Sequence, residues 1–554
     1  MNNILTYTPL GGVGDVTKNM HVYEMGNEIL VVDCGLGFAD ETMLGVELLL
    51  PDISYLKNAV KSGKKIVGMA ITHGHEDHMG ALPFLLPDLP WFPIVASPLT
   101  AEFANGKLKE FGLTQRVQKV EFDGGEVKFG QFSLNFIRVT HSIPDTSHIF
   151  IKTPVGNFYH GSDFKFELSP FDGKRSDLKK ISDLSKQGVY CLMSDCLRSE
   201  EKGHTPSEEG ILRALEEELA KTSGKFIVTT YSSNIARLNQ IIAAAAKFGR
   251  KICFVGRSTI NTKEMAESLG YMKIAKGMEV PLDQLKNYKD SNIVMIAAGS
   301  QGQENSALTR IANGDHKDIK LKNGDTVVFS ADPIPGNEIS VNSLIDTMLK
   351  QGARVIYSGI DDRFHVSGHA ASEDLAMLMH LVNPKKVLPI GGTYKQMVQY
   401  KHIAKEQEFS DKDILLIENG QPVIFTREGT SLGKKISLKN VYVDQISGEE
   451  VESFVLRDRQ KLATEGVVIV MVELDASNGQ LADKPNIIVR GFSSQEAQEI
   501  SKDLAKQLKN SLSQKKKPVT DWIYTRKFVG EISERYIFKA FRKRPLVLPV
   551  VIEV

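Results

Sequence analysis

Residues 1–200 contain many short apolar runs that are separated by glycine, aspartate and asparagine. The pattern predicts β-strands with helices between some of them, and the strands are expected at 28–34, 65–72, 94–96, 132–140, 148–152 and 157–160. Several strands end on a polar residue, as where the run 65–72 leads directly into His73. Polar residues at the ends of buried strands are typical of a site at the edge of a layered α/β domain.

A different pattern, in which helices and strands alternate, begins near residue 206. Helices are predicted at 207–221, 234–248 and 258–269, and strands at 225–230, 251–255, 292–298 and 326–330. This alternation predicts a doubly wound parallel sheet, and hence a second domain. The first pattern then returns, with predicted strands at 354–357, 386–390 and 414–418. We therefore expect residues 206–353 to be inserted into a first domain that comprises residues 1–205 and 354–428.

The last part of the chain changes character again. Residues 429–455 are polar with little periodicity, which predicts a linker. Residues 456–554 contain predicted strands at 466–474, 486–489 and 546–554 and a predicted helix at 494–512. These elements predict a small α+β domain.

Charge is balanced over the chain, because lysine plus arginine and aspartate plus glutamate both total 68. A global basic field therefore cannot recruit nucleic acid, and any such binding must use a local patch or groove. The run Lys515-Lys516-Lys517 is interpreted as a solvated helix end rather than as such a patch. The hydrophobic share of 42% is that of a soluble globular protein, and 554 residues are too many for one core.

Three features predict a cytoplasmic protein without a membrane segment. The four cysteines form no CxxC pair, which favours free thiols in a reducing compartment. The first residues lack a basic region followed by a long apolar one, so no secretory signal is apparent. The longest strongly apolar stretch, 466–472, is too short to span a bilayer.

The densest chemical signal lies at positions 73–78, which hold His73, His75, Asp77 and His78 in a chain with only 13 histidines. Zn²⁺ binds imidazole nitrogen and carboxylate oxygen readily. On a tight loop after a strand, His73 and His75 can face one ion while Asp77 and His78 face another. Two ions about 3.5–4 Å apart can clamp the oxygens of a phosphoryl group. The cluster therefore predicts a metal-dependent hydrolase.

One loop cannot supply two metal sites, so further ligands are expected at later strand ends. His141 follows the predicted strand 132–140, and Asp163 could bridge both ions. Asp33 directly follows residues 28–32 of the first predicted strand and would orient the metal loop through hydrogen bonds. Each of these three alone could be an ordinary loop residue, and they gain weight only as a set.

The 73–78 loop resembles the HxHxDH signature of the metallo-β-lactamase superfamily, and the inserted domain narrows the resemblance to the β-CASP branch of nucleases. Several segments resemble the ribonuclease J family: 11–14, 18–20, 140–145, 163–166, 299–302, 333–338, 365–370 and 543–554. The resemblance implies a metallo-β-lactamase αββα sandwich with an inserted β-CASP α/β domain and a small C-terminal α+β domain with a role in dimerisation.

The resemblance also implies roles for single residues. It makes His73, His75 and His141 ligands of a first ion and Asp77 and His78 ligands of a second, with Asp163 between them. It assigns catalysis to Asp77, Asp195 and His369, the last two acting together on the leaving oxygen or the scissile phosphate. The implied RNA and phosphate-binding residues are Ser233, Asn234, Ser300, Gln301, His365, Ser367 and Gly368. Serine hydroxyls and glycine N–H groups can approach an anion closely.

The sequence departs from the family at Gly391, where a Pro-Ile-His-Gly-like turn would supply a histidine to the second ion. Glycine cannot bind metal through a side chain, so we expect the second site to be weaker and to need Mn²⁺ or Mg²⁺. His402 is not expected to compensate. Ala371, Ser372 and Cys196 are smaller departures.

These expectations define a metal-dependent ribonuclease with two divalent ions, zinc being favoured. It would act as a 5′→3′ exoribonuclease with additional endoribonuclease activity on RNA carrying a 5′-monophosphate, in rRNA processing and mRNA decay. A homodimer or homotetramer and protein partners of RNA decay are implied as well. One alternative is an inactive RNA-binding subunit beside an active paralogue, against which the intact 73–78 loop argues. Another is a small-molecule hydrolase on the same scaffold, against which the inserted domain argues.

Overall fold

The computed structural model describes residues 4–40, 42–334, 336–444, 450–477, 480–513 and 522–554. The chain forms two compact units. The first comprises Met1–Phe38 and Leu49–Asn440, and the second comprises Ala39–Leu48 and Val441–Val554. Among the described residues, no helix is long and apolar enough to cross a membrane.

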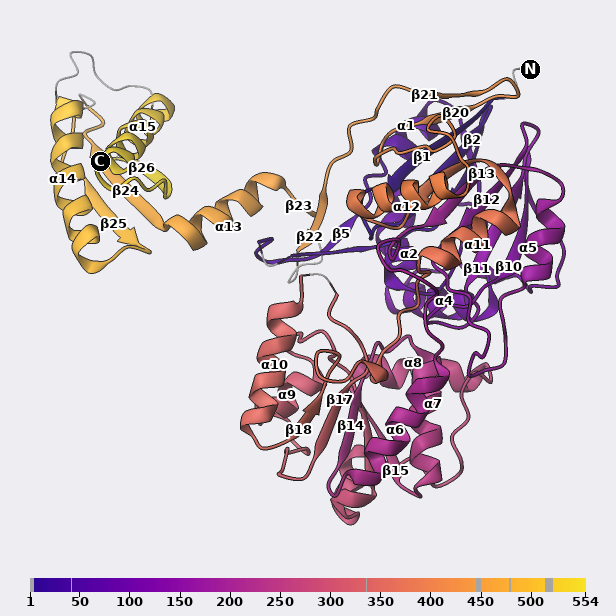
Figure 1. The fold of residues 1–554 in the computed structure, drawn as a ribbon. Helices are drawn as coiled ribbons and strands as arrows, with labels where there is room; N and C mark the ends of the chain where they lie inside the picture. Colours follow the sequence, from indigo (N-terminus) through magenta and orange to yellow (C-terminus); the bar gives the residue numbers. More distant parts are fainter. Residues whose placement is uncertain (1–3, 41, 335, 445–449, 478–479, 514–521) are drawn as a thin grey trace. The chain divides into compact units, whose positions relative to one another are not determined.

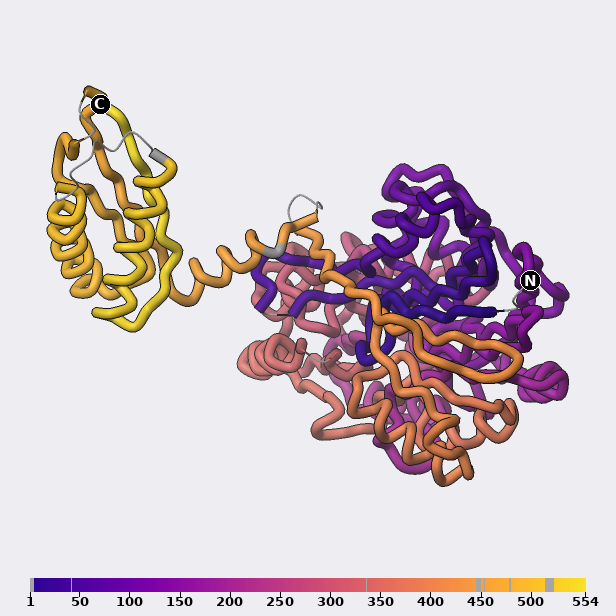
Figure 2. Tube along the Cα trace, turned by 90° about the horizontal axis from the view of Figure 1, so that it is seen from above, coloured from indigo at the N-terminus to yellow at the C-terminus, as the bar shows by residue number. Residues whose placement is uncertain are grey.

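Two β-sheets lie at the centre of the first unit. The larger contains, in order across the sheet, β21 (Thr430–Leu432), β20 (Val423–Phe425), β1 (Leu5–Gly11), β2 (Met20–Met25), β3 (Glu28–Val32), β6 (Lys65–Ile71), β7 (Ile94–Ala96) and β8 (Val117–Lys119). The smaller contains β19 (Pro384–Ile390), β13 (Val189–Asp195), β12 (Asn157–Gly161), β11 (Ser147–Lys152), β10 (Phe132–Arg138) and β9 (Val127–Phe129). Figure 2 shows the β20–β21 segment, in orange, beside the N-terminal strands, in indigo.

Apolar side chains from both sheets form one core. Leu30 and Tyr7 from the larger sheet join Phe136, Phe150 and Phe158 from the smaller one, and all five are fully or almost fully buried. Helices cover the outer faces: α1 (Ser54–Lys61) and α4 (Pro98–Glu110) pack against β6, β7 and β8, and α11 (Ser372–Val382) and α12 (Tyr394–Glu406) pack against β13 and β19. The expected αββα sandwich is thereby confirmed.

The inserted part of the first unit has a separate sheet of five parallel strands. Their order is β15 (Lys251–Val255), β16 (Ile293–Ala297), β14 (Phe226–Thr229), β17 (Thr326–Phe329) and β18 (Arg354–Ile356). Figure 1 shows α9 (Ala307–Ala312) and α10 (Glu338–Lys350) on one face and α6 (Glu209–Lys221) and α7 (Ile235–Lys247) on the other, with α8 (Arg257–Ser268) beside β15. Because both faces are covered, the central strands are buried along their length, as the sequence pattern predicted.

One predicted strand is wrong. Residues 414–418 form no strand, and only Ile414 makes a single bridge, to Val387 of β19. Ile414 and Ile417 are buried, so their apolar character reflects burial in the core rather than strand pairing. The sequence pattern also missed α15 (Trp522–Phe541), a helix of 20 residues.

The second unit contains a sheet of three strands, β25 (Asn486–Arg490), β24 (Val467–Leu474) and β26 (Leu546–Glu553), in that order. Every second residue of β24 is buried against α14 (Ser494–Ser513) and α15. The segment 39–48 belongs to this unit, where Arg459 of α13 (Ser453–Glu465) donates to the carbonyls of Leu44 and Gly45.

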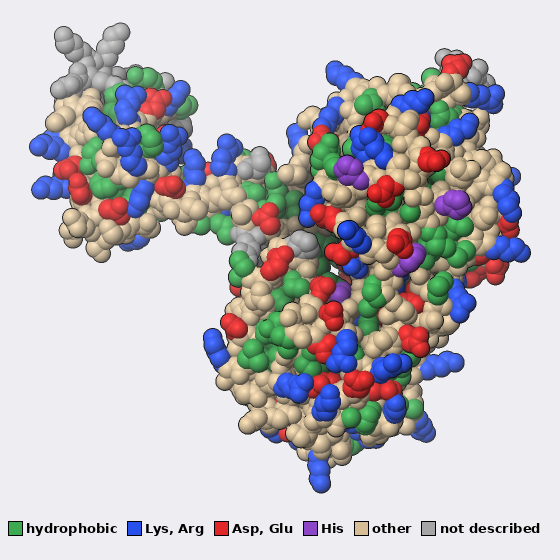
Figure 3. Space-filling view, viewed as in Figure 1, with side chains coloured by type: hydrophobic (Ala, Val, Ile, Leu, Met, Phe, Trp, Pro, Cys, Tyr) green, Lys and Arg blue, Asp and Glu red, His purple; other side chains and the backbone are tan. Residues whose placement is uncertain are grey.

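The part of the chain expected to be a linker, 429–455, contains β21, β22 (Val441–Asp444) and β23 (Glu450–Val451). Its residues 445–449 lie outside the described residues, as do Lys515–Lys517 and Pro335. On the face of the molecule in Figure 3, lysine and arginine are interspersed with aspartate and glutamate. That distribution agrees with the balanced net charge.

Candidate metal centre

Residues 72–75 connect β6 to the short helix α2 (Glu76–Met79) at the edge where β3 also ends. The carboxylate of Asp33, just after β3, accepts from N and Oγ1 of Thr72 at 2.7 and 2.8 Å. It also accepts from Nδ1 of His78 at 2.8 Å. Asp33 is fully buried and has a φ of 64°, a conformation that aspartate tolerates better than most residues. Asp33 therefore holds both ends of segment 72–78 and turns Nε2 of His78 toward the carboxylates of Asp77 and Asp163.

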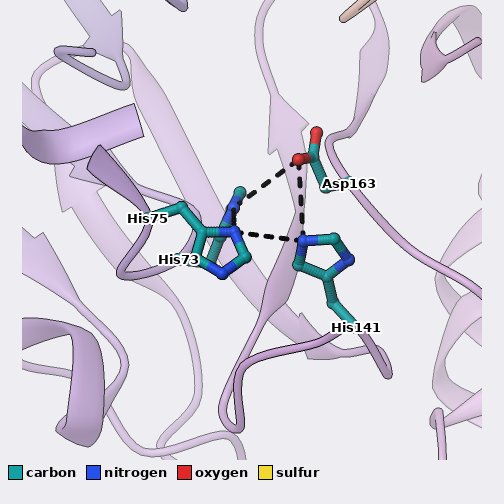
Figure 4. A group of neighbouring side chains, drawn as sticks. All are labelled: His73, His75, His141 and Asp163. Carbon is teal, nitrogen blue, oxygen red and sulfur yellow. Dashed lines mark hydrogen bonds and ion pairs between the residues drawn. The ribbon is translucent and has the colours of Figure 1, made fainter. Parts of the chain in front are cut away.

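Four ligand atoms converge beside this loop, from His73, His75, His141 and Asp163, and all lie within 4.8 Å of one another. Nδ1 of His75 lies 3.1 Å from Nε2 of His73 and 3.1 Å from Nε2 of His141. Oδ2 of Asp163 lies 3.6 Å from His73 Nε2 and 3.7 Å from His141 Nε2. Figure 4 shows the three rings and the carboxylate directed toward a common point. Three imidazole nitrogens and one carboxylate oxygen are a donor set that suits a divalent transition metal.

The ring of His141 is oriented by a residue far away in the sequence. Nδ1 of His141 donates to the carbonyl of Gly368 at 2.7 Å, which leaves the Nε2 lone pair for the converging group. A Cβ at position 368 would lie 2.6 Å from Nδ1 of His141. Only glycine permits this close approach.

A second group consists of Asp77, His78 and Asp163. Nε2 of His78 lies 3.4 Å from Oδ2 of Asp163 and 3.6 Å from Oδ2 of Asp77. Asn19, which the sequence analysis did not assign to the site, has its Nδ2 3.1 Å from His78 Nε2 and 3.2 Å from the Asp77 carbonyl. Its one sequence signal is its place in segment 18–20, which is among those that carry the family resemblance.

A third group consists of Asp163, Asp195 and His369. Asp163 follows β12, Asp195 ends β13 and Gly391 follows β19, and these three strands are parallel neighbours. Their carboxyl ends therefore bring the three positions together. Nδ1 of His369 lies 2.8 Å from Oδ2 of Asp195, and Nε2 of His369 lies 3.9 Å from Oδ2 of Asp163.

Gly391 faces this group. Its φ is 66°, and a Cβ there would lie 3.5 Å from Oδ1 of Asp195 and 3.8 Å from Oδ1 of Asp163. A side chain at this position would start toward the carboxylates, whereas glycine contributes no ligand. His402 lies exposed on α12 and belongs to none of the three groups.

The electrostatics of the cluster favour a cation. Burial lowers the pKa of His75 to about 3 and lowers the pKa values of His73 and His141 as well, so these rings are neutral. Burial also lowers the pKa of His78, but the carboxylates of Asp163, Asp77 and Asp33 outweigh it and raise that pKa well above 6.5. Neutral imidazoles beside clustered carboxylates are suitable ligands for a metal ion. The residues present therefore fit a metal site.

The other predicted site residues lie around the carboxyl ends of the parallel strands of the inserted sheet. Ser233 and Asn234 follow β14, and Ser300 and Gln301 follow the neighbouring β16. Oδ1 of Asn234 caps α7 by accepting from N of Arg237 at 3.0 Å. Nδ2 of Asn234 is buried and has no hydrogen-bond partner among the described residues.

Gln301 has both ends of its amide occupied by the chain. Its Nε2 donates to the Asp332 carbonyl at 3.0 Å, and its Oε1 accepts from N of Ile334 at 2.7 Å. Gln301 therefore holds the loop after β17, and Ser300 is buried beside it.

The segment 365–368 contacts both the metal ligands, through Gly368 and His141, and the inserted part, through His365 and Tyr231. The ring of His365 lies 6.3 Å from that of Tyr231, and burial lowers the pKa of His365 to about 4. Oγ of Ser367 accepts from N of His369 at 3.1 Å. Together with the Gly368–His141 contact, this connects the segment directly to the metal ligands.

Four family descriptions match this chain. They are "Metallo-beta-lactamase superfamily" over residues 13–181, "Ribonuclease J, beta-CASP domain" over 223–348, "Zn-dependent metallo-hydrolase RNA specificity domain" over 358–415 and "Ribonuclease J C-terminal domain" over 454–554. The third of these matches contains His365, Ser367, Gly368, His369 and Gly391.

The matches to relatives cover almost the whole chain. Ribonuclease J2 of Bacillus subtilis is 32% identical, and the match covers 98% of this chain and 98% of that protein. Ribonuclease J of Thermus thermophilus is 36% identical, with 98% and 94% covered. A crystal structure of a protein of unknown function from Enterococcus faecalis covers 76% of this chain and 100% of that chain, with a TM-score of 0.53 and 15% identity. This last likeness concerns the fold alone.

Proposed function

This chain belongs to the ribonuclease J family, and from that premise we propose that it is a metal-dependent ribonuclease that hydrolyses RNA phosphodiesters. The observation that carries the proposal is the convergence of His73, His75, His141 and Asp163 within 4.8 Å. The inactive-subunit alternative is not favoured, because the three ligand groups contain every metal-binding side chain that the sequence offered for them.

Two divalent ions are proposed. His73, His75, His141 and Asp163 would hold the first, and Asp77, His78 and Asp163 would hold the second. Zn²⁺ suits the nitrogen-rich first group, whereas the second, which lacks a ligand from Gly391, is proposed to accept Mn²⁺ or Mg²⁺ as well. Such cations supply Lewis acidity toward phosphoryl oxygens and make water a better nucleophile.

The chain's own residues would complete the reaction. Asp195 accepts from Nδ1 of His369 at 2.8 Å, which turns Nε2 of His369 toward the ligand group. From there, Nε2–H can donate a proton to the 3′-oxygen as it leaves phosphorus. Asp77 contributes as a ligand, and Asp33 acts through its hydrogen bonds to Thr72 and His78.

A phosphate of the RNA is proposed to bind at the carboxyl ends of the inserted strands, among Ser233, Asn234, Ser300, Gln301, His365, Ser367 and Gly368. Nδ2 of Asn234 is buried and finds no acceptor among the residues that the structure describes, which supports this assignment, because a buried donor without an acceptor is costly unless a ligand supplies one. The amino end of α7, a helix of 13 residues, adds a favourable dipole for an anion.

A pocket for a 5′-monophosphate near the metal ions would favour 5′→3′ exonucleolytic cleavage, with endonucleolytic cleavage as a second mode. The proposed biological role is processing of rRNA and decay of mRNA in the cytoplasm, together with other proteins of RNA decay. The proposed domain boundaries remain those expected from the sequence: 1–205 with 354–428, 206–353, the linker 429–455, and 456–554.

A homodimer, or a homotetramer built from it, is proposed through the second unit. Its sheet packs one face against α14 and α15. On β26, Leu548, Val550 and Ile552 are each 39–40% exposed, and Ile469 pairs in register with Leu548. An apolar sheet face left open to water is typical of an association surface.

The test uses purified protein and RNA with a 5′-monophosphate and a 3′-label, with Zn²⁺, Mn²⁺ or Mg²⁺ added. Metal-dependent decay is expected, together with its loss in the variant His75→Ala. RNA binding without cleavage under all three metals would contradict the enzyme and favour the inactive subunit.

A further inference from the structure

Four charged side chains form a buried network between the two parts of the first unit: Lys165, Glu167, Glu208 and Arg237. They are 1%, 4%, 5% and 0% exposed, respectively. Nη2 of Arg237 donates to Oε2 of Glu208 at 2.8 Å. Nζ of Lys165 lies 3.2 Å from Oε1 of Glu208 and 3.5 Å from Oε2 of Glu167. The network is neutral, with two cations and two anions.

One end of this buried network contacts the segments that surround the proposed phosphate pocket. Nη1 of Arg237 donates to the carbonyl of Phe364 at 2.8 Å, and Phe364 directly precedes His365. The same nitrogen donates to the carbonyl of Ser330, just after β17, at 3.0 Å. Arg237 itself lies in the first turn of α7, which Asn234 caps. A single guanidinium therefore fixes three separate segments around the pocket.

The other end of the network contacts the segments that carry two of the metal ligands. Lys165 lies two residues after Asp163, and its backbone N donates to the Thr140 carbonyl at 2.8 Å. Oγ1 of Thr140 donates to the carbonyl of Lys165 at 2.6 Å and accepts from N of Glu167 at 3.1 Å. Because Thr140 precedes His141, the network is anchored beside two of the ligands of the first group.

Ionic contacts of this kind fix the relative position of two packed segments more firmly than apolar packing does. Hydrogen bonds between charged groups are directional, and a buried charge that loses its partner is strongly destabilised. Burial alone raises the pKa of Glu208, but the charges of Arg237 and Lys165 outweigh it and lower that pKa to about 2. Glu208 is therefore ionised and holds both cations.

We propose that Glu208 and Arg237 are positioning residues that fix the phosphate pocket relative to the metal centre, and thereby set the enzyme's preference for RNA with a 5′-monophosphate. The inference rests on the proposed ribonuclease function. Neither residue needs to contact RNA. Their effect would come from the separation of pocket and metal ligands, to which cleavage is sensitive on the scale of about 1 Å.

The experiment compares the full-length variants Glu208→Gln and Arg237→Lys with the wild type. Each is assayed on two RNAs that differ only in a 5′-monophosphate or a 5′-hydroxyl, with kcat and KM determined separately. The matched control is Asp325→Asn. Asp325 is also buried and pairs with Lys225 at 2.7 Å, but both residues precede their strands and so lie at the opposite, amino ends of the inserted sheet.

We expect the 5′-phosphate preference, the ratio of kcat/KM on the two RNAs, to fall about tenfold or more in both network variants. KM should rise on the phosphorylated RNA and change little on the hydroxyl RNA. Like the network variants, Asp325→Asn should lower the melting temperature, but its ratio of kcat/KM on the two RNAs should equal that of the wild type. Arg237→Lys retains the positive charge and loses the planar guanidinium with its several donors. It therefore tests the positioning role if Glu208→Gln does not fold.

An equal ratio in the network variants, the control and the wild type would overturn the positioning role while the ribonuclease stands. A fall that is equally large in Asp325→Asn would overturn it too, since general destabilisation would then be the cause. A wild type that cleaves neither RNA would instead overturn the proposed function, and the inference with it.

Discussion

Nδ1 of His369 lies 2.8 Å from Oδ2 of Asp195, although the two residues are 174 positions apart in the chain. Burial alone would lower the pKa of His369, but Asp195 and Asp163 outweigh it and raise that pKa to about 9. Asp195 is almost completely buried, so its carboxylate has little solvent to compete for this contact. The pair is thus held in one orientation relative to Asp163.

Replacing Asp195 by asparagine removes the negative charge that orients the ring of His369 and keeps it protonated. We expect kcat on RNA to fall about 10²–10⁴-fold with a small change in KM, because proton donation is lost and binding is not. Steady-state kinetics on a labelled RNA provide the check. His204→Gln breaks another histidine–aspartate pair, with Asp374 at 2.7 Å, and should leave kcat within about twofold. An Asp195→Asn enzyme as fast as this control would exclude the proton-donor role.

Adding a Cβ at Gly368 should weaken the first metal site. In Gly368→Ala the new atom would lie 2.6 Å from Nδ1 of His141, so the ring must turn and lose its carbonyl acceptor. Metal affinity is expected to fall about 10–100-fold, as measured by competition with a zinc chelator. Gly210→Ala, where nothing lies within 4 Å of the added Cβ, is the control. Equal affinities in the two variants would refute the orienting role of Gly368.

Gly391→His offers a ligand where the sequence has none. A side chain there starts 3.8 Å from Oδ1 of Asp163, so we expect tighter binding of a second ion and activity at lower Mn²⁺ concentrations. The left-handed φ of 66° costs about 1 kcal/mol for a side chain. Gly391→Ala carries that cost without a ligand and separates the two effects. Titration calorimetry that finds the same second-site affinity in both variants would count against the weakened site.

Acid should remove the stability that Glu208 contributes. Its pKa of about 2 in the folded chain lies below its ordinary value of 4.5, so the contribution is complete above about pH 4.5 and is lost as the pH falls through 2. The full effect corresponds to about 3 kcal/mol. Urea unfolding should therefore show a larger gap between wild type and Glu208→Gln at pH 6 than at pH 3. A gap that grows toward low pH has the wrong sign for an ionised Glu208.

A charge on the open sheet face of the second unit should block association. Val550→Glu places a carboxylate where the side chain is 40% exposed and apolar. Sedimentation of the wild type is expected to give a dimer or larger species, and that of the variant a monomer. Lys509→Glu, on the exposed side of α14, controls for the change in charge. A variant that associates like the wild type would move the interface elsewhere.

The sequence alone determined the features that depend on local pattern. Short apolar runs predicted strands in both large domains, because a strand that is covered on both faces needs apolar residues along its length. The 73–78 loop predicted metal chemistry, since His73, His75, Asp77 and His78 come from one strand end. The hydrophobic pattern of the sequence was misleading where a segment is buried without being paired in a sheet. Ile414 is buried, for example, but pairs through a single bridge.

Only the tertiary structure decided which distant residues act on one another. His141 meets the carbonyl of Gly368 across 227 positions, and no local period encodes that contact. Arg237, which looks like an ordinary helix residue in the sequence, is fully buried and bonded to Glu208, Ser330 and Phe364. Such contacts arise because parallel strands end at a common edge and because buried charges must find partners. Both conditions are met only when the whole chain has folded.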